Sequence, residues 1–166
     1  MATKTARMLE TRNDLDAESR EKLVALLNAR LADTFDLYSQ LKQAHWSVRG
    51  SDFFQLHELY DTIAEAVLGF VDEIAERATA LGGLATGTVR MAAGASSLEE
   101  YPLDAIAGKD TVEVVADRLA TYGAAVRSAA DEAESELGDL DTQDLFIEIS
   151  RSIDKHLWFV EAHLQA

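Results

Sequence analysis

Residues 43–77 read QAHWSVRGSDFFQLHELYDTIAEAVLGFVDEIAER, and their apolar positions follow the period of an α-helix. From Leu56 onward, apolar side chains recur every three or four residues and form one continuous stripe on a helix. A turn at Ser51 precedes this stripe, and a glycine pair at 82–83 follows it. Because glycine commonly ends helices, the pattern predicts a long amphipathic helix that follows the turn at Ser51 and runs to about Leu81.

Histidine and carboxylate residues form a second strip on the same helix. His57 and Asp61 are four residues apart near its start, and Asp72 and Glu76 are four residues apart near its end. At about 100° per residue, the members of each pair lie on one helical face. The two aspartates are about 16 Å apart along the helix axis, at a rise of about 1.5 Å per residue. The two pairs therefore cannot share a metal ion within one helix.

The two pairs are placed symmetrically about one point of the helix, between Glu65 and Leu68. His57 is as far before this point as Glu76 is after it, and the same holds for Asp61 and Asp72. If the helix packs antiparallel against its own copy across a two-fold axis at that point, the first pair of one chain meets the second pair of the other. His45, on the apolar stripe of the preceding helix, would add a second imidazole. One such pair alone is usually a solvated helix face, so the shared centre is what favours two intersubunit metal sites.

The available ligand types favour iron. The sequence has no cysteine, which excludes disulfides and thiolate zinc sites and leaves histidine and carboxylate as the strong ligands. Two ions joined by carboxylates suit the oxidation of ferrous iron, because each metal gives one electron while the carboxylates neutralise the ferric charge. The net charge of -15 attracts cations and repels nucleic acid, and it would also suit a salt-adapted organism.

Three more segments show the helical pattern. They are predicted from about Asp16 to before Gly50, from a capping box at Asp110 and Glu113 to Gly138, and from about Thr142 to Leu164. The connection at residues 83–108 is far longer than the usual link of about 2 to 8 residues in a bundle. Two helical hairpins joined by one long crossover have the connectivity of a ferritin-like four-helix bundle. We expect a short helix in the crossover near SSLEEY, residues 96–101.

Length and composition indicate one domain. With 166 residues, of which 48% are hydrophobic, the chain can form one sizeable core. We expect a flexible N-terminal tail at residues 1–15 and a ferritin-like four-helix bundle at residues 16–166. No segment is apolar over the roughly 18 residues of a membrane span, and the N-terminus lacks the apolar region of a secretion signal. We therefore expect a cytoplasmic protein with no membrane partner.

The segment HWSVRGSDFFQLHELYDTIAEAVLGFVDEIAER, together with SIDKHLWFVEAHLQ in the last helix, resembles the Dps family, DNA-binding proteins from starved cells that form twelve-subunit miniature ferritins. The resemblance implies an all-α fold that assembles as a hollow homo-dodecamer. It also implies a di-iron ferroxidase site, made by His45, His57 and Asp61 of one subunit with Asp72 and Glu76 of its dyad partner. Family members oxidise Fe(II), preferably with hydrogen peroxide, and store the ferric mineral, which protects the cell from oxidative damage.

The resemblance extends to two further features. Trp46 matches the family tryptophan that donates an electron when only one iron is bound, although an aromatic core anchor is an equal alternative. The segment ESELGDLDTQDLF resembles the lining of the family's acidic three-fold pore, which implies that Glu134, Asp139 and Asp144 line an ion-entry path. His156 and His163 lie outside the matched motif, and we expect each to be a packed or surface residue.

Other functions remain as alternatives. The chain has no Glu-x-x-His motif, which disfavours a larger ferritin that holds both irons within one bundle. The first 14 residues carry few basic side chains, and no basic extension follows the last helix, so we expect weak or absent DNA binding. The main alternative is a DNA-compacting nucleoid protein with a vestigial metal site, and a plain helical scaffold is a further one.

Overall fold

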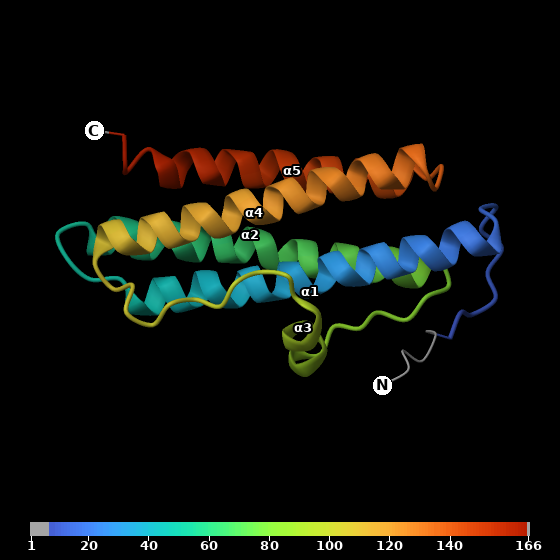
Figure 1. Cartoon of the computed structure of the whole chain (residues 1–166), viewed down its shortest axis with the longest axis horizontal. Helices are drawn as coiled ribbons and strands as arrows, with labels where there is room; N and C mark the ends of the chain where they lie inside the picture. Colours follow the sequence, from blue (N-terminus) through green and yellow to red (C-terminus); the bar gives the residue numbers. More distant parts are fainter. Residues whose placement is uncertain (1–6, 166) are drawn as a thin grey trace.

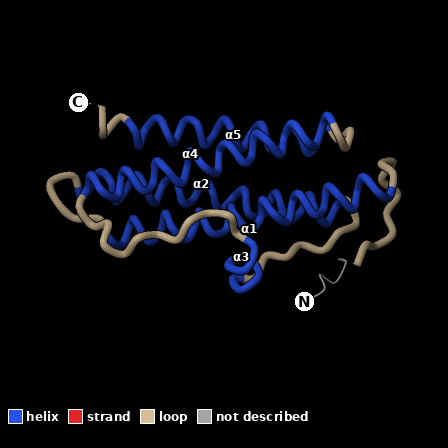
Figure 2. Tube along the Cα trace, in the orientation of Figure 1, coloured by secondary structure: helices blue, strands red, loops and turns tan. Residues whose placement is uncertain are grey.

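The described part of the chain folds into five helices joined by loops (Figure 1). The computed structural model describes residues 7–165. The helices are α1 (Ala17–Ser47), α2 (Phe53–Ala80), α3 (Val89–Ala95), α4 (Gly108–Ser135) and α5 (Leu140–Glu161). The residues described contain no β-strand, and Figure 2 shows only helices and the loops between them. The predicted all-α fold is confirmed. Within residues 7–165, no helix has the length and apolar character needed to cross a membrane.

The four long helices form two hairpins. α1 packs mainly against α2, and α4 packs mainly against α5. The segment from Leu81 to Ala107 runs back along the bundle and carries α3 on its way (Figure 1). The long crossover predicted from the sequence therefore returns the chain to the end of the bundle where α2 begins, so that α4 starts beside the turn between α1 and α2.

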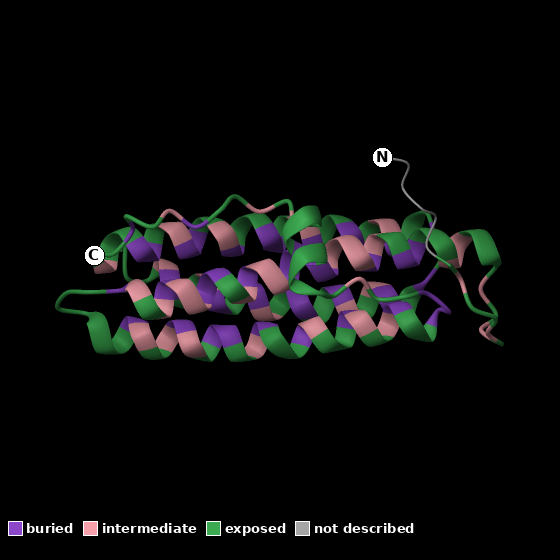
Figure 3. Cartoon of the chain, turned by 90° about the horizontal axis from the view of Figure 1, so that it is seen from below, coloured by how far each residue is buried: buried purple, intermediate pink, exposed green. Residues whose placement is uncertain are grey.

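The core lies along the inner faces of the four long helices (Figure 3). Two buried tyrosines cross it. The Tyr60 hydroxyl is 2.9 Å from the Thr111 hydroxyl, and the Tyr122 hydroxyl is 2.6 Å from that of Thr34. Because a buried hydroxyl without a partner is costly, these pairs fix the register of α4 against α2 and α1.

The short helix lies earlier in the crossover than the sequence predicted. α3 begins after Thr88, whose hydroxyl accepts a hydrogen bond from the Met91 amide at 3.4 Å, and it ends before residues 96–101. Ser97 instead donates from its amide and its hydroxyl to Asp33 at 2.7 and 3.0 Å. Serine competes with helical bonding in this way, so residues 96–101 bind to α1 rather than form a helix.

Two predicted helix starts were wrong. α4 begins at Gly108 with no side-chain cap, so the capping box proposed at residues 110–113 does not form. Its start is held by backbone bonds instead: the Arg49 amide donates to Ile106 at 2.8 Å, and the Gly108 amide donates to Arg49 at 3.0 Å. α5 begins at Leu140 rather than Thr142, because the Asp139 side chain caps it.

The predicted flexible tail at residues 1–15 does not fit the contacts of its second half. Residues 1–6 lie outside the part of the chain that is described. The Leu9 amide donates to the Gly82 carbonyl at 2.7 Å, which holds the segment against the end of α2. Arg20 donates to the Leu15 and Leu81 carbonyls at 3.2 Å each and links the same pieces.

Substituting Gly82 tests this contact. Gly82 has φ +86, and a Cβ there would lie 2.6 Å from the Leu9 carbonyl oxygen. We expect Gly82→Ala to lower the free energy of unfolding by about 1–3 kcal/mol, because alanine is strained at positive φ and meets backbone. Chemical denaturation measures the change. Gly94→Ala is the control, since a Cβ there meets nothing within 4 Å, and equal stability of the two variants would contradict the prediction.

Candidate metal centre

The turn between α1 and α2 brings two histidines together. His45 lies in the last turn of α1, and His57 lies in the second turn of α2. Gly50, with φ +116, lets the chain reverse between them. The two imidazole rings stack with their centroids 3.6 Å apart and their planes at 19°. Residues 12 positions apart in the sequence therefore form one compact pair.

Reciprocal hydrogen bonds determine the tautomer of both histidines. Nδ1 of His45 lies 2.7 Å from the His57 carbonyl oxygen, and Nδ1 of His57 lies 2.9 Å from the His45 carbonyl oxygen. A carbonyl oxygen only accepts, so each Nδ1 carries the proton and donates it. In the neutral imidazole, Nε2 then keeps a lone pair that can bind a metal ion, as in protein metal sites where Nδ1 donates to a carbonyl group.

The pair lines an open hollow of about 400 Å³. The other residues around this hollow are Trp46, Arg49 and Phe53. Phe53 packs against the His57 ring at a centroid distance of 5.0 Å. The Trp46 side chain is 60% exposed, so it is not a core anchor in this chain. The imidazoles are thus supported on one side by aromatic packing and are reached by solvent from the other.

Asp61 lies one turn further along α2 and is bound by a lysine. Lys42 of α1 forms an ion pair with Asp61, and the exposed fractions of the two side chains are 21% and 39%. The hydrogen bond from Lys42 is the main cause that lowers the pKa of Asp61, and the charges of Lys42, His45 and His57 add to it. Partial burial acts in the opposite direction. Asp61 is therefore ionised at neutral pH.

Asp72 and Glu76 lie near the other end of α2, and both are exposed. In the described part of the chain, no three or more histidine, cysteine or carboxylate side chains are grouped closely enough to hold a metal ion. The predicted ligands thus lie in two separate candidate half-sites, one with His45 of α1 beside His57 and Asp61 of α2, and the other with Asp72 and Glu76 near the end of α2. Between them the helix surface is exposed at Glu65, Leu68 and Gly69, the stretch on which the predicted two-fold axis would lie.

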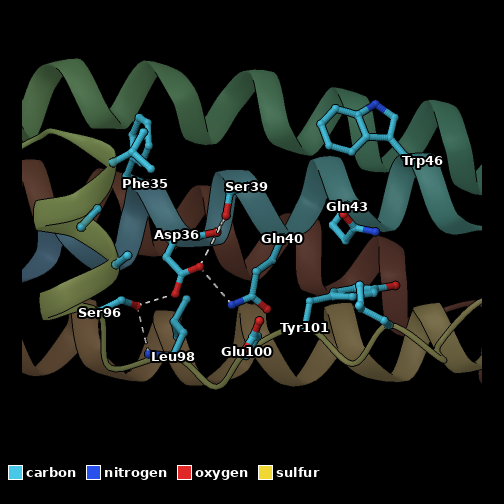
Figure 4. Close-up of a pocket in the computed structure, with 14 residues that line it drawn as sticks. Phe35, Asp36, Ser39, Gln40, Gln43, Trp46, Ser96, Leu98, Glu100 and Tyr101 are labelled. Carbon is cyan, nitrogen blue, oxygen red and sulfur yellow. Dashed lines mark hydrogen bonds between the residues drawn. The ribbon is translucent and has the colours of Figure 1, made fainter.

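A larger cavity of about 580 Å³ lies beside the hollow, between α1, α3 and the crossover. Figure 4 shows Trp46 at one end of this cavity and Phe35 at the other. In its wall, Asp36 accepts hydrogen bonds from Gln40 at 3.2 Å and from Ser96 at 2.6 Å. The bond from Ser96 holds the crossover against α1. Trp46 lines both this cavity and the hollow beside the histidines.

Comparison with known proteins places the chain in a family. The profile of the ferritin-like domain matches residues 24–166. A DNA protection during starvation protein from Agrobacterium fabrum is 37% identical over 156 residues, covering 94% of this chain and 96% of that protein. The corresponding protein from Mycolicibacterium smegmatis is 34% identical over 144 residues, covering 85% of this chain and 76% of its own length. The chain belongs to the Dps family.

Solved Dps structures have the same fold. DpsC from Streptomyces coelicolor superposes with a TM-score of 0.90 at 29% identity, covering 99% of this chain and 95% of that one. An archaeal Dps homologue from Halobacterium salinarum superposes with a TM-score of 0.87, also at 29% identity, covering 99% and 92%. The ferritin-like bundle predicted from the sequence is confirmed.

One of the acidic residues predicted to line the Dps pore has a different role. Asp139 is 5% exposed, and the Arg77 guanidinium donates to both of its carboxylate oxygens at 2.9 and 2.7 Å. Burial alone would raise the pKa of Asp139, but the hydrogen bonds from Thr142 and Arg77 outweigh it and lower the pKa. The charge of Arg77 thus balances that of the ionised Asp139 carboxylate, which caps α5 and does not fit the pore prediction. Glu134 and Asp144 are exposed at the same turn.

Sequence reasoning missed Lys42 at the candidate centre. The signal was available, because Lys42 lies three residues before His45 and four before Trp46, which places all three on neighbouring positions of one helix surface. Its pairing with Asp61 on α2 required the packing of the two helices. His156 is buried as expected, and its pKa is lowered by burial and then by Lys155. His163 lies at the surface, with Nδ1 2.9 Å from the Phe159 carbonyl.

Proposed function

We propose that this Dps-family chain is a ferroxidase, which oxidises Fe(II), preferably with hydrogen peroxide, and stores the ferric product inside a shell of twelve identical subunits. Each reaction centre combines His45, His57 and Asp61 of one subunit with Asp72 and Glu76 of its two-fold partner. Iron is the substrate and the stored cargo of this reaction. In the cytoplasm, the shell would limit oxidative damage by removing iron and peroxide together.

The observation that carries the proposal is the reciprocal hydrogen bonding of His45 and His57. It holds both rings in place and leaves both Nε2 lone pairs available beside an open hollow. The negative charge for a ferric product comes from Asp61 and, across the dyad, from Asp72 and Glu76. Burying these carboxylates at one interface without a cation would cost about several kcal/mol of desolvation free energy per charge, so a metal-free interface is disfavoured.

The proposed reaction uses each group for one task. The imidazoles bind ferrous iron, and the carboxylates bridge the two ions and compensate the charge that develops on oxidation. Each hydrogen peroxide molecule accepts one electron from each of two ferrous ions and also takes up two protons. Its O–O bond breaks, and two water molecules form. No hydroxyl radical is released in this balance. When a single iron is bound, the exposed indole of Trp46 beside His45 would supply the second electron.

Entry of iron into the shell would use the acidic turn between α4 and α5. Glu134 and Asp144 are the residues that we assign to this path, since both are exposed there. Asp139 is excluded by its bonds to Arg77. The net charge of -15 would concentrate ferrous ions around the particle.

The alternative is a DNA-compacting protein with a vestigial metal site. The relatives from Agrobacterium fabrum and Mycolicibacterium smegmatis carry DNA protection in their names. In this chain the charge of -15 opposes contact with phosphates. We therefore expect protection of DNA to come from iron and peroxide removal, with weak or absent direct binding at physiological salt.

The stoichiometry of peroxide consumption tests the proposal. Ferrous iron is added anaerobically to the assembled protein, hydrogen peroxide follows, and near-ultraviolet absorbance reports the ferric product. We expect two ferrous ions to be oxidised for each peroxide, a soluble product, and far less spin-trapped hydroxyl radical than in buffer. Oxidation at the buffer rate with a full yield of radical would contradict a ferroxidase and would favour the vestigial site.

A further inference from the structure

The Lys42 ammonium is bound to Asp61, one of the proposed metal ligands. Its Nζ forms an ion pair with Asp61 Oδ1, across the packed faces of α1 and α2. The Lys42 side chain is 21% exposed, so it is held against the bundle rather than extended into solvent. A divalent cation bound to the same carboxylate would lie next to this positive charge, and the two cations would repel each other.

A second place for the ammonium lies one helical turn away. Lys42 Nζ is 6.0 Å from the centroid of the Trp46 ring, at the outer limit of a cation–π contact. Trp46 is 60% exposed, so its face is open to an approaching side chain. The lysine stem is flexible, and its ammonium can move from the carboxylate toward the indole without any change in α1.

We propose that Lys42 is a displaceable positioning residue, which holds the Asp61 carboxylate while the centre is empty and moves toward Trp46 when a divalent cation binds Asp61. The inference rests on the ferroxidase centre proposed above. Among the described residues no cationic side chain binds the imidazoles, whereas the Asp61 carboxylate shares its charge with the ammonium until Lys42 moves away. Lys42 thereby weakens the binding of a divalent cation at Asp61. When the cation binds, the Lys42 ammonium comes closer to the Trp46 ring.

Zinc binding tests the proposal without any redox step. Zn²⁺ has no redox chemistry and accepts imidazole and carboxylate ligands, so calorimetry of the assembled protein measures affinity alone. We expect Lys42→Met to bind Zn²⁺ about twofold to fivefold more tightly, because a partly exposed ion pair of ordinary strength no longer competes. Lys42→Arg keeps the charge and the pairing, and we expect its affinity to stay near that of the unsubstituted protein.

Lys22→Met is the matched control. Lys22 is also on α1 and forms an ion pair with Glu18 at 2.7 Å, far from the histidines in sequence. The substitution removes the same charge and the same type of contact, and we expect no change in Zn²⁺ affinity. An equal gain in Lys22→Met and Lys42→Met would show a general charge effect and overturn the proposal.

Trp46 fluorescence gives a second readout, recorded in a Trp158→Phe background. Zn²⁺ should change the Trp46 emission when Lys42 is present and change it much less in Lys42→Met. If Zn²⁺ binds the unsubstituted protein, is lost in Asp72→Ala, and binds Lys42→Met with unchanged affinity, the proposal is wrong while the ferroxidase centre stands. If Asp72→Ala binds Zn²⁺ as well as the unsubstituted protein, the shared centre fails and the role of Lys42 fails with it.

Discussion

Asp72→Ala is expected to lower the initial rate of Fe(II) oxidation by peroxide about a hundredfold or more, toward the rate in buffer. In the proposed centre each subunit contributes Asp72 to its partner, so the substitution would remove a carboxylate from both centres of a dimer. Even the substitution of residues that only support metal ligands commonly lowers metal affinity or activity by about tenfold to a hundredfold. Stopped-flow absorbance after anaerobic iron loading measures the rate.

The fold should survive this substitution. Asp72 is exposed, and it forms no hydrogen bond or ion pair with the residues that the structure describes. Asp117→Ala is the control, since it removes an exposed carboxylate from α4, away from α2. We expect Asp117→Ala to keep the full rate and both variants to unfold at the same denaturant concentration. A full oxidation rate in Asp72→Ala would rule out the proposed ligand set.

Mixing two inactive variants should restore activity. His57→Ala damages the half-site at the start of α2, and Asp72→Ala damages the half-site at its end. A mixed dimer carries one centre with both substitutions and one centre with neither. With random exchange, half of the dimers are mixed, so we expect about a quarter of the unsubstituted rate. Each variant alone should stay near the buffer rate.

The mixing experiment needs proof that subunits have exchanged. The two variants are dissociated, combined in equal amounts and reassembled, and native mass spectrometry of a mass-labelled sample counts mixed particles. Each variant treated alone in the same way controls for partial reactivation. Verified exchange with no gain in rate would show that the centre does not span two subunits. Recovery of activity in either variant alone would show that its substituted residue is not required, which would also contradict the proposed centre.

The sequence alone predicted the helices and the candidate ligands where a local period carried the information. The apolar stripe from Leu56 and the centred pairs around Glu65 and Leu68 depend only on residues a few turns apart on one helix. The resemblance to Dps was confirmed by the ferritin-like profile over residues 24–166 and by solved Dps structures. The ligand set itself stays a prediction, because it needs a second subunit.

The features that the sequence did not predict correctly involve contacts between distant segments. Arg77 and Asp139 are 62 residues apart, and only their packing shows that this carboxylate is a buried cap rather than a pore residue. The short helix was placed too late, because Ser97 bonds to Asp33 across 64 residues. In each case the sequence suggested a local role for a polar residue, whereas in the structure that residue bonds to a partner from a distant segment.

The sequence by itself determined that this protein is a helical bundle, and it predicted two pairs of metal ligands on one helix, because helical periodicity relates spacing directly to position on a face. Only the tertiary structure decided how the half-site near His57 is prepared. The packing of α1 against α2 stacks His45 on His57, directs each Nδ1 to a carbonyl group, and brings Lys42 to Asp61. These contacts join residues of different helices, and no period within one helix specifies them.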